Sequence, residues 1–125
     1  MILIGHPLIA YKPFYGIQAE EDIGKTPSNA TVIFDFNATL AAYCQSQKII
    51  FALHVKNIKE LILAHALEAS YFIVDKSLAI NAQKVADDYM FDGKVMLASN
   101  DEADIEFVAL SAIDGILFND SIITV

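Results

Sequence analysis

Five short runs rich in β-branched and aromatic residues recur along this chain of 125 residues, and they constrain its fold more than any other feature. The runs begin about 18 to 23 residues apart, and each is almost continuously apolar rather than alternating between apolar and polar. Strands that are covered on both faces have this pattern. The runs are residues 31–36, 49–53, 71–74, 94–98 and 115–118.

Segments with the apolar spacing of amphipathic helices lie between these runs, at residues 58–65, 78–89 and 105–112. Strands that alternate with helices through short connections indicate parallel pairing by right-handed crossovers. The sequence therefore predicts an α/β fold with a mainly parallel sheet of five or six strands flanked by helices. We expect a three-layer open sheet, with a partial TIM-like barrel as the alternative.

The length of the chain predicts one α/β domain over residues 1–125. Its regular βα repeats span residues 31–120. The three prolines all lie in residues 1–30, which we interpret either as an irregular N-terminal arm or as an extra βα unit with a strand near residues 8–17. Residues 121–125 are β-prone and predict a terminal edge strand, which favours pairing with another chain.

The charge balance excludes some classes of partner. The chain has sixteen acidic residues and eight basic ones, all of which are lysine, so the net charge is -8. Nucleic acid and anionic membranes are bound by cationic surfaces, so we expect neither as a partner. Hydrophobic residues make up 55% of the chain, which predicts apolar surface beyond one small core and therefore a homo-oligomer, most simply a homodimer.

The compartment is inferred from cysteine usage and from the lengths of the apolar runs. The single cysteine, Cys44, cannot form an intramolecular disulfide and is interpreted as a thiol in the core. No apolar run has the length of a membrane span or the flanks of a signal peptide. We therefore expect a cytoplasmic protein.

Polar residues follow the apolar runs, at the points where ligands bind in parallel sheets. Asn, Asp and Ser also cap helices and form turns at such junctions whether or not a ligand binds, and this structural interpretation is the favoured one. No catalytic or metal-binding role is assigned and no glycine-rich phosphate loop is found, so no cofactor is expected. The candidate ligand-binding residues are Asp35, Asn37, His54, Asp75, Lys76, Ser99, Asn100, Asn119 and Asp120.

Residues 32–40, with the sequence VIFDFNATL, resemble the nucleophile loop of haloacid-dehalogenase-type phosphatases, where a strand ends in Asp-x-Asp-Gly-Thr-Leu. The resemblance implies that Asp35 attacks a phosphoryl group whose charge is neutralised by Mg²⁺. Asn37 occupies the position of the family's general acid, and an amide cannot supply a proton.

Residues 31–120 also resemble, in order, the receiver domains of two-component signalling. Asp35 and Asn37 fall near the acidic pocket of that family, Asp75 falls at the phosphoacceptor, and Ser99 falls at the switch hydroxyl. The family's Lys-Pro pair is absent after the fifth run, and so is its last helix. This resemblance implies an interaction domain that is not phosphorylated.

A third resemblance is to the βα units of phosphate-binding TIM barrels. Residues 60–75 are similar to their succession of helix, Gly-Ala, strand and Asp, and residues 107–118 repeat it. A closed barrel has about eight units, and this chain would supply five or six. The resemblance implies an arc whose concave side is bare unless a partner or the N-terminal arm covers it.

Each resemblance departs from its family at a residue that the family's chemistry needs. Our hypothesis is therefore a noncatalytic cytoplasmic module that binds a protein partner or a small ligand where the strands end. The alternative is a Mg²⁺-dependent phosphohydrolase or phosphotransfer enzyme that uses Asp35 and Asp75.

Overall fold

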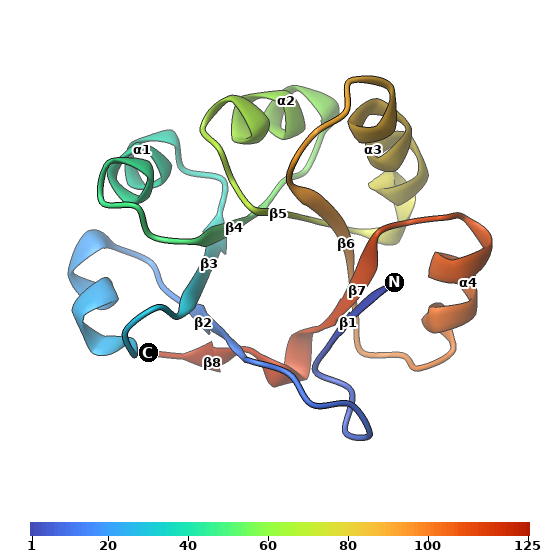
Figure 1. The fold of residues 1–125 in the computed structure, drawn as a ribbon, viewed down its shortest axis with the longest axis horizontal. Coiled ribbons are helices and arrows are strands. Elements are labelled where there is room, and N and C mark those ends of the chain that lie inside the picture. Colours follow the sequence, from blue (N-terminus) through green and yellow to red (C-terminus); the bar gives the residue numbers. More distant parts are fainter.

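The computed structural model describes residues 1–125 as one curled parallel sheet with helices outside it (Figure 1). The strands are β1 (Ile2–Ile4), β2 (Phe14–Gly16), β3 (Thr31–Asp35), β4 (Phe51–His54), β5 (Tyr71–Val74), β6 (Lys94–Ser99), β7 (Gly115–Phe118) and β8 (Ile123–Thr124). The helices are α1 (Ala38–Ser46), α2 (Ile58–Ala66), α3 (Lys76–Asp88) and α4 (Asp104–Leu110), with 3-10 helices η1 (Glu20–Lys25) and η2 (Asn119–Ser121).

All eight strands are parallel, in the order β1-β7-β6-β5-β4-β3-β2-β8. The prediction of an α/β fold with a parallel sheet is confirmed, but the expected count of five or six strands is wrong. The extra strands β1, β2 and β8 come from the two terminal segments. They are only two or three residues long, too short to show a periodic pattern in the sequence.

The expected three-layer arrangement is also wrong, because all four α-helices lie on the outer face of the sheet (Figure 1). From β3 to β7 each strand is placed beside the one before it, with no reversal of direction across the sheet. Right-handed crossovers without a reversal put every helix on the same face, whereas an open three-layer sheet needs a reversal. The result is a half-barrel, in line with the alternative of a partial barrel.

Two apolar clusters fill the two faces of this sheet. The larger one, of 23 buried residues, lies between the sheet and the helices. The smaller one lines the concave face and takes one residue from each of the first seven strands: Ile4, Phe14, Ile33, Ala52, Ile73, Met96 and Leu117. Ile4 and Phe14 of this cluster belong to residues 1–30, so the N-terminal arm helps to cover the concave side, which was one of the two expected possibilities.

The curl brings together side chains from strands that are not neighbours in the sheet. Phe14 of β2 and Tyr71 of β5 lie three strands apart, yet their ring centroids are 5.0 Å apart. A flat sheet would separate these strands by about 14 Å, since neighbouring strands are spaced by about 4.8 Å. Their contact shows how tightly the sheet curves around its inner cluster.

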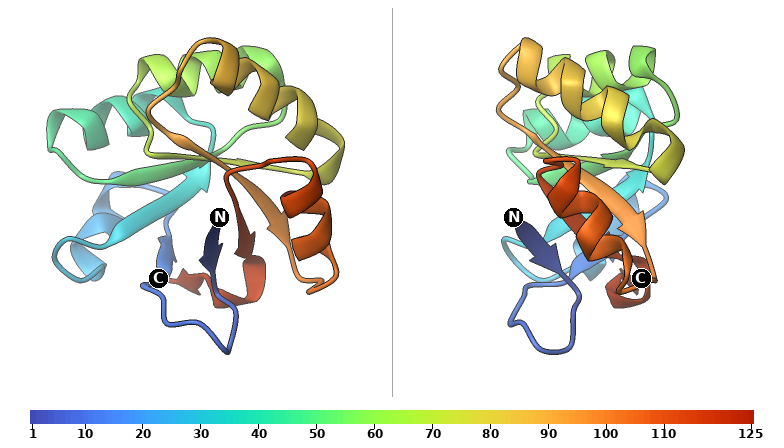
Figure 2. Two further views of the ribbon diagram at one scale, coloured as in Figure 1. Left: turned by 45° about the vertical axis from the view of Figure 1, so that its right-hand side comes forward. Right: turned by 90° about the vertical axis from the view of Figure 1, so that its right-hand side faces the viewer.

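The terminal segments complete the two edges of the sheet. β1 pairs with β7 at one edge, and β8 pairs with β2 at the other. The chain between β1 and β2 and the chain between β7 and β8 both cross the open side between these edges (Figures 1 and 2). The two crossings touch at Gly5, where φ is +102° and a side chain would lie 2.4 Å from Ser121 Oγ. Only glycine fits this position.

The predicted strand near residues 8–17 is shorter than expected, since β2 covers only Phe14–Gly16. Cys44 is fully buried, as predicted, and burial raises the pKa of its thiol to about 11. No helix has the length and apolar character needed to cross a membrane.

Candidate functional site

Three of the candidate side chains leave the carboxyl ends of neighbouring strands on the concave side. Asp35 ends β3, His54 ends β4, and Asp75 directly follows β5. The residues two positions earlier, Ile33, Ala52 and Ile73, all belong to the inner cluster. Because side chains two residues apart in a strand point to the same face, the sheet directs Asp35, His54 and Asp75 to the mouth of the half-barrel.

A cavity of about 640 Å³ lies at this mouth, above the inner cluster, and we call it the carboxyl-end cavity. Its volume is in the range of small-molecule sites. Apolar side chains, among them Ile33, Ile73 and Ala98, line part of it. The polar side chains that line it are Gln18, Asp35, Asn37, His54, Asp75, Asn119 and Thr124.

His54 lies between the two carboxylates of this cavity. Its Nε2 is 3.3 Å from Asp75 Oδ1, and its Nδ1 is 3.5 Å from Asp35 Oδ1. A neutral imidazole carries one N–H and donates to only one carboxylate, whereas a protonated ring donates to both. The carboxylates remain largely open to solvent, with 81% of the Asp35 side chain and 71% of the Asp75 side chain exposed, so both are accessible to a ligand.

The residue that precedes each of the helices α1, α2 and α3 lies just beyond the carboxyl end of a strand. Asn37 and Asn57 accept hydrogen bonds from the backbone N–H groups of Leu40 and Glu60, at 3.1 and 2.9 Å, and thereby cap α1 and α2. Asp75 is the residue that precedes α3. The Asp75 side chain makes no capping hydrogen bond and contacts His54 instead.

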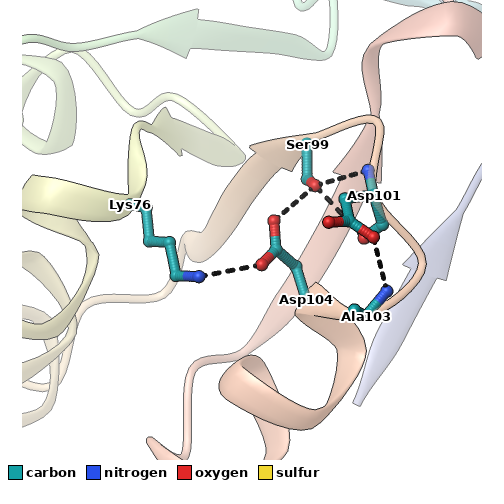
Figure 3. A network of polar contacts seen from close by, with 5 residues as sticks. All are labelled: Lys76, Ser99, Asp101, Ala103 and Asp104. Atoms are coloured by element: carbon teal, nitrogen blue, oxygen red, sulfur yellow. Dashed lines mark hydrogen bonds and ion pairs between the residues drawn. The ribbon is translucent and has the colours of Figure 1, made fainter.

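Lys76 and Ser99 lie outside the carboxyl-end cavity, in a network that joins α3, α4 and β6 (Figure 3). Ser99 Oγ donates to Asp104 Oδ2 at 2.7 Å, and Lys76 Nζ donates to Asp104 Oδ1 at 3.0 Å. The hydrogen bond from Ser99 and then the one from Lys76 lower the pKa of Asp104. Because Ala98 lines the cavity, the next residue in the strand faces the helices.

Asn100 and Asp120 line a second cavity, of about 400 Å³, beside the segment that follows β1. Asn100 Oδ1 accepts a hydrogen bond from the Asp120 backbone N–H at 3.1 Å. His6 also lines this cavity and is buried, with 8% of its surface exposed. Its Nδ1 accepts a hydrogen bond from the Leu8 N–H at 3.1 Å, and its Nε2 lies 3.6 Å from Glu102 Oε1.

The candidate residues thus divide between separate places. Five of them line the carboxyl-end cavity: Asp35, Asn37, His54, Asp75 and Asn119. Sequence reasoning missed Gln18 and Thr124, which line the same cavity from the terminal segments. Gln18 follows β2 just as the other candidates follow their strands, so recognition of the short strand Phe14–Gly16 would have found it.

The donor set of this cavity does not form a metal centre. No group of three or more His, Cys, Asp or Glu side chains in the molecule is placed to hold a metal ion. Asp35 and Asp75 contact opposite nitrogens of one imidazole rather than converging on a common point.

No protein-family model matches the chain, and a search of curated proteins finds no match. The fold and the cavity therefore define the class of this protein on their own: a parallel α/β half-barrel with a polar cavity at the carboxyl ends of its strands.

Proposed function

We propose that this protein binds a small molecule in the carboxyl-end cavity and does not transform it. One observation carries the proposal: four polar side chains at the carboxyl ends of four different strands line a single cavity, namely Asp35, His54, Asp75 and Asn119. Cavities with an apolar lining and a few convergent polar groups are the usual form of small-molecule sites. Parallel sheets place such sites where their strands end.

Binding rather than catalysis is favoured by the surroundings of His54. Its Nε2 is hydrogen-bonded to Asp75 at 3.3 Å and its Nδ1 lies 3.5 Å from Asp35 Oδ1, so both nitrogens are directed at carboxylates of the protein itself. A general base needs a nitrogen directed at the proton that it removes. A small ligand is favoured over a protein partner because the polar groups converge on a hollow, whereas protein interfaces need a broad surface.

The test is a fragment screen followed by NMR spectroscopy of the ¹⁵N-labelled protein. We expect some fragments to shift the amide signals of the cavity residues, and we expect Ala98→Phe to abolish this binding because the new ring occupies the cavity. Ala42→Phe is the matched control, since Ala42 is exposed on α1. The proposal fails if no fragment shifts these signals, or if Ala98→Phe binds fragments as well as Ala42→Phe does.

The competing function is a Mg²⁺-dependent phosphohydrolase or phosphotransfer enzyme, which is favoured by the presence of Asp35 and Asp75 in one cavity. Such an enzyme needs a nucleophilic carboxylate and a second carboxylate near the same ion. A screen of phosphoesters with Mg²⁺, repeated on Asp35→Asn, separates the two functions. Turnover that is lost in Asp35→Asn would establish the enzyme and overturn the noncatalytic proposal.

A further inference from the structure

We infer that the ligand of the carboxyl-end cavity is an organic cation, with an ammonium or similar nitrogen head on an apolar body. This inference rests on the proposed function and adds the chemical class of the ligand. It is drawn from the charges of the cavity, from the unused hydrogen-bonding capacity of its two carboxylates, and from its apolar lining.

The charge of the cavity favours a positive ligand. Its ionisable side chains are Asp35, Asp75 and His54, and no lysine lines it. The chain contains no arginine, and Lys76, the one lysine among the candidate residues, is held by Asp104 at 3.0 Å. The cavity is therefore negative whether His54 is neutral or protonated, and it would repel a phosphate or a carboxylate.

The two carboxylates also have hydrogen-bonding capacity that the protein does not use. An ionised carboxylate only accepts hydrogen bonds and has about four acceptor positions. Asp75 has a single side-chain partner, His54 at 3.3 Å, and Asp35 has only the same ring at 3.5 Å. A ligand with several N–H donors would fill these positions with charge-assisted hydrogen bonds.

The position of Asp75 strengthens this point, because the residue before a helix normally caps it. Asn37 and Asn57 occupy the same position before α1 and α2, and the side-chain oxygen of each accepts a hydrogen bond from a backbone N–H of its helix. Asp75 makes no such bond. The Asp75 carboxylate therefore does not cap its own helix, and it lines the cavity instead.

The apolar part of the cavity lining indicates the chemistry of the rest of the ligand. Ala98 and Ile122 line the cavity beside the polar groups and keep part of their apolar surface exposed. An apolar ligand body would remove this surface from water, whereas a bare metal ion would leave it exposed. The absence of any three-residue metal-binding group also favours an organic cation over a metal ion.

The experiment compares benzylamine, benzyl alcohol and phenylacetate, which share a phenyl ring and differ in the charge of the head group. Each is titrated into the ¹⁵N-labelled protein at pH 7, and the amide signals of the cavity residues are followed. We expect benzylamine to bind most tightly and phenylacetate to bind least. We expect Asp35→Asn and Asp75→Asn each to weaken benzylamine binding by about five- to tenfold, and to leave benzyl alcohol nearly unchanged.

Asp92→Asn is the matched control, because it removes one negative charge at an exposed position away from the cavity. An equal loss of benzylamine binding in Asp92→Asn would overturn the inference by showing a response to net charge alone. Tighter binding of phenylacetate or of benzyl alcohol than of benzylamine would also overturn it, while the proposed function would stand. If neither these compounds nor any fragment of the screen shifts the cavity signals, the proposed function fails together with the inference.

Discussion

Ser99 shows how one step along a strand separates a ligand-binding side chain from a structural one. Ala98 lines the carboxyl-end cavity, and Ser99 lies on the other face of β6, where it donates to Asp104. The Ser99 hydroxyl also accepts a hydrogen bond from the Asp101 N–H at 2.9 Å. Its hydrogen bonds join β6 to α4, so we assign it to stability.

Replacement of Ser99 by alanine is expected to lower the free energy of unfolding by about 1–2 kcal/mol at pH 7, because a hydrogen bond to a carboxylate is lost. Ser99 lowers the pKa of Asp104 below its ordinary value of 3.8. The contribution of this pairing is therefore complete above that value and is lost as the pH falls through the lower folded-state pKa. Urea denaturation should show the difference between wild type and Ser99→Ala shrinking in acid.

The control for this prediction is Ser77→Ala, since Ser77 is exposed and makes no hydrogen bond to a carboxylate. We expect this variant to change stability little at either pH. A Ser99→Ala deficit that stays constant as the pH falls would contradict the assigned role of Asp104.

The sequence predicted that the candidate residues lie at the ends of the strands, but it did not predict to which face of the sheet each side chain points. The rule that ligands bind where parallel strands end pointed correctly to the rim, and five of the nine candidates line the carboxyl-end cavity. The rule could not say which face each side chain takes, because continuous apolar runs hide the alternation between faces. Ser99 and Lys76 were therefore grouped with His54, although they point to the helices.

At the scale of elements, the long-range pairing of short strands was the main thing that the sequence could not show. The five apolar runs all form strands, with bounds within two residues of those expected. β1 and β2 have three residues each, and β1 is stabilised by pairing with β7, far along the chain. Local patterns carry no information about such a distant partner.

Gly115 tests this pairing, because it is the residue of β7 that faces Ile2 of β1. A Cβ atom at position 115 would lie 2.5 Å from the Ile2 carbonyl oxygen and 2.7 Å from Met96 Sδ. We expect Gly115→Ala to destabilise the protein by about 1–3 kcal/mol through overpacking and to displace β1. Hydrogen exchange should show faster exchange of the β1 amides.

Gly24→Ala is the control, since nothing lies within 4 Å of the Cβ position of Gly24. We expect this variant to leave the exchange of β1 unchanged. Full protection of β1 in Gly115→Ala would show that the edge of the sheet adjusts without cost.

At the scale of the whole molecule, the choice between an open sheet and a half-barrel is made by strand order rather than by composition. Both arrangements bury both faces of the sheet, so both produce continuous apolar runs. The two arrangements differ in whether each new strand joins the same edge of the growing sheet, and no local sequence pattern indicates this. Small inner residues such as Ala52 and Gly115 allow the tight curl, but they have many other uses in a sequence.

The oligomeric state remains a prediction at this scale. The filled concave face removes one reason to expect a dimer, since the chain needs no partner there. The apolar excess still has to be accommodated, and large apolar side chains such as Leu8, Met90 and Leu110 are more than 80% exposed. We expect a homodimer in light scattering at micromolar concentration. The mass of a single chain would contradict this expectation.

The pairing of β1 with β7 fixes the order in which the molecule can be completed during translation. β2 to β7 can each join a neighbour made shortly before or after them, so the centre of the sheet can assemble while synthesis continues. β1 is made before the other strands of the sheet, yet it has no partner until Gly115–Leu117 have been made. Of the strands in this sheet, the first to be made is therefore among the last to be paired, and its pairing closes the longest loop in the sheet.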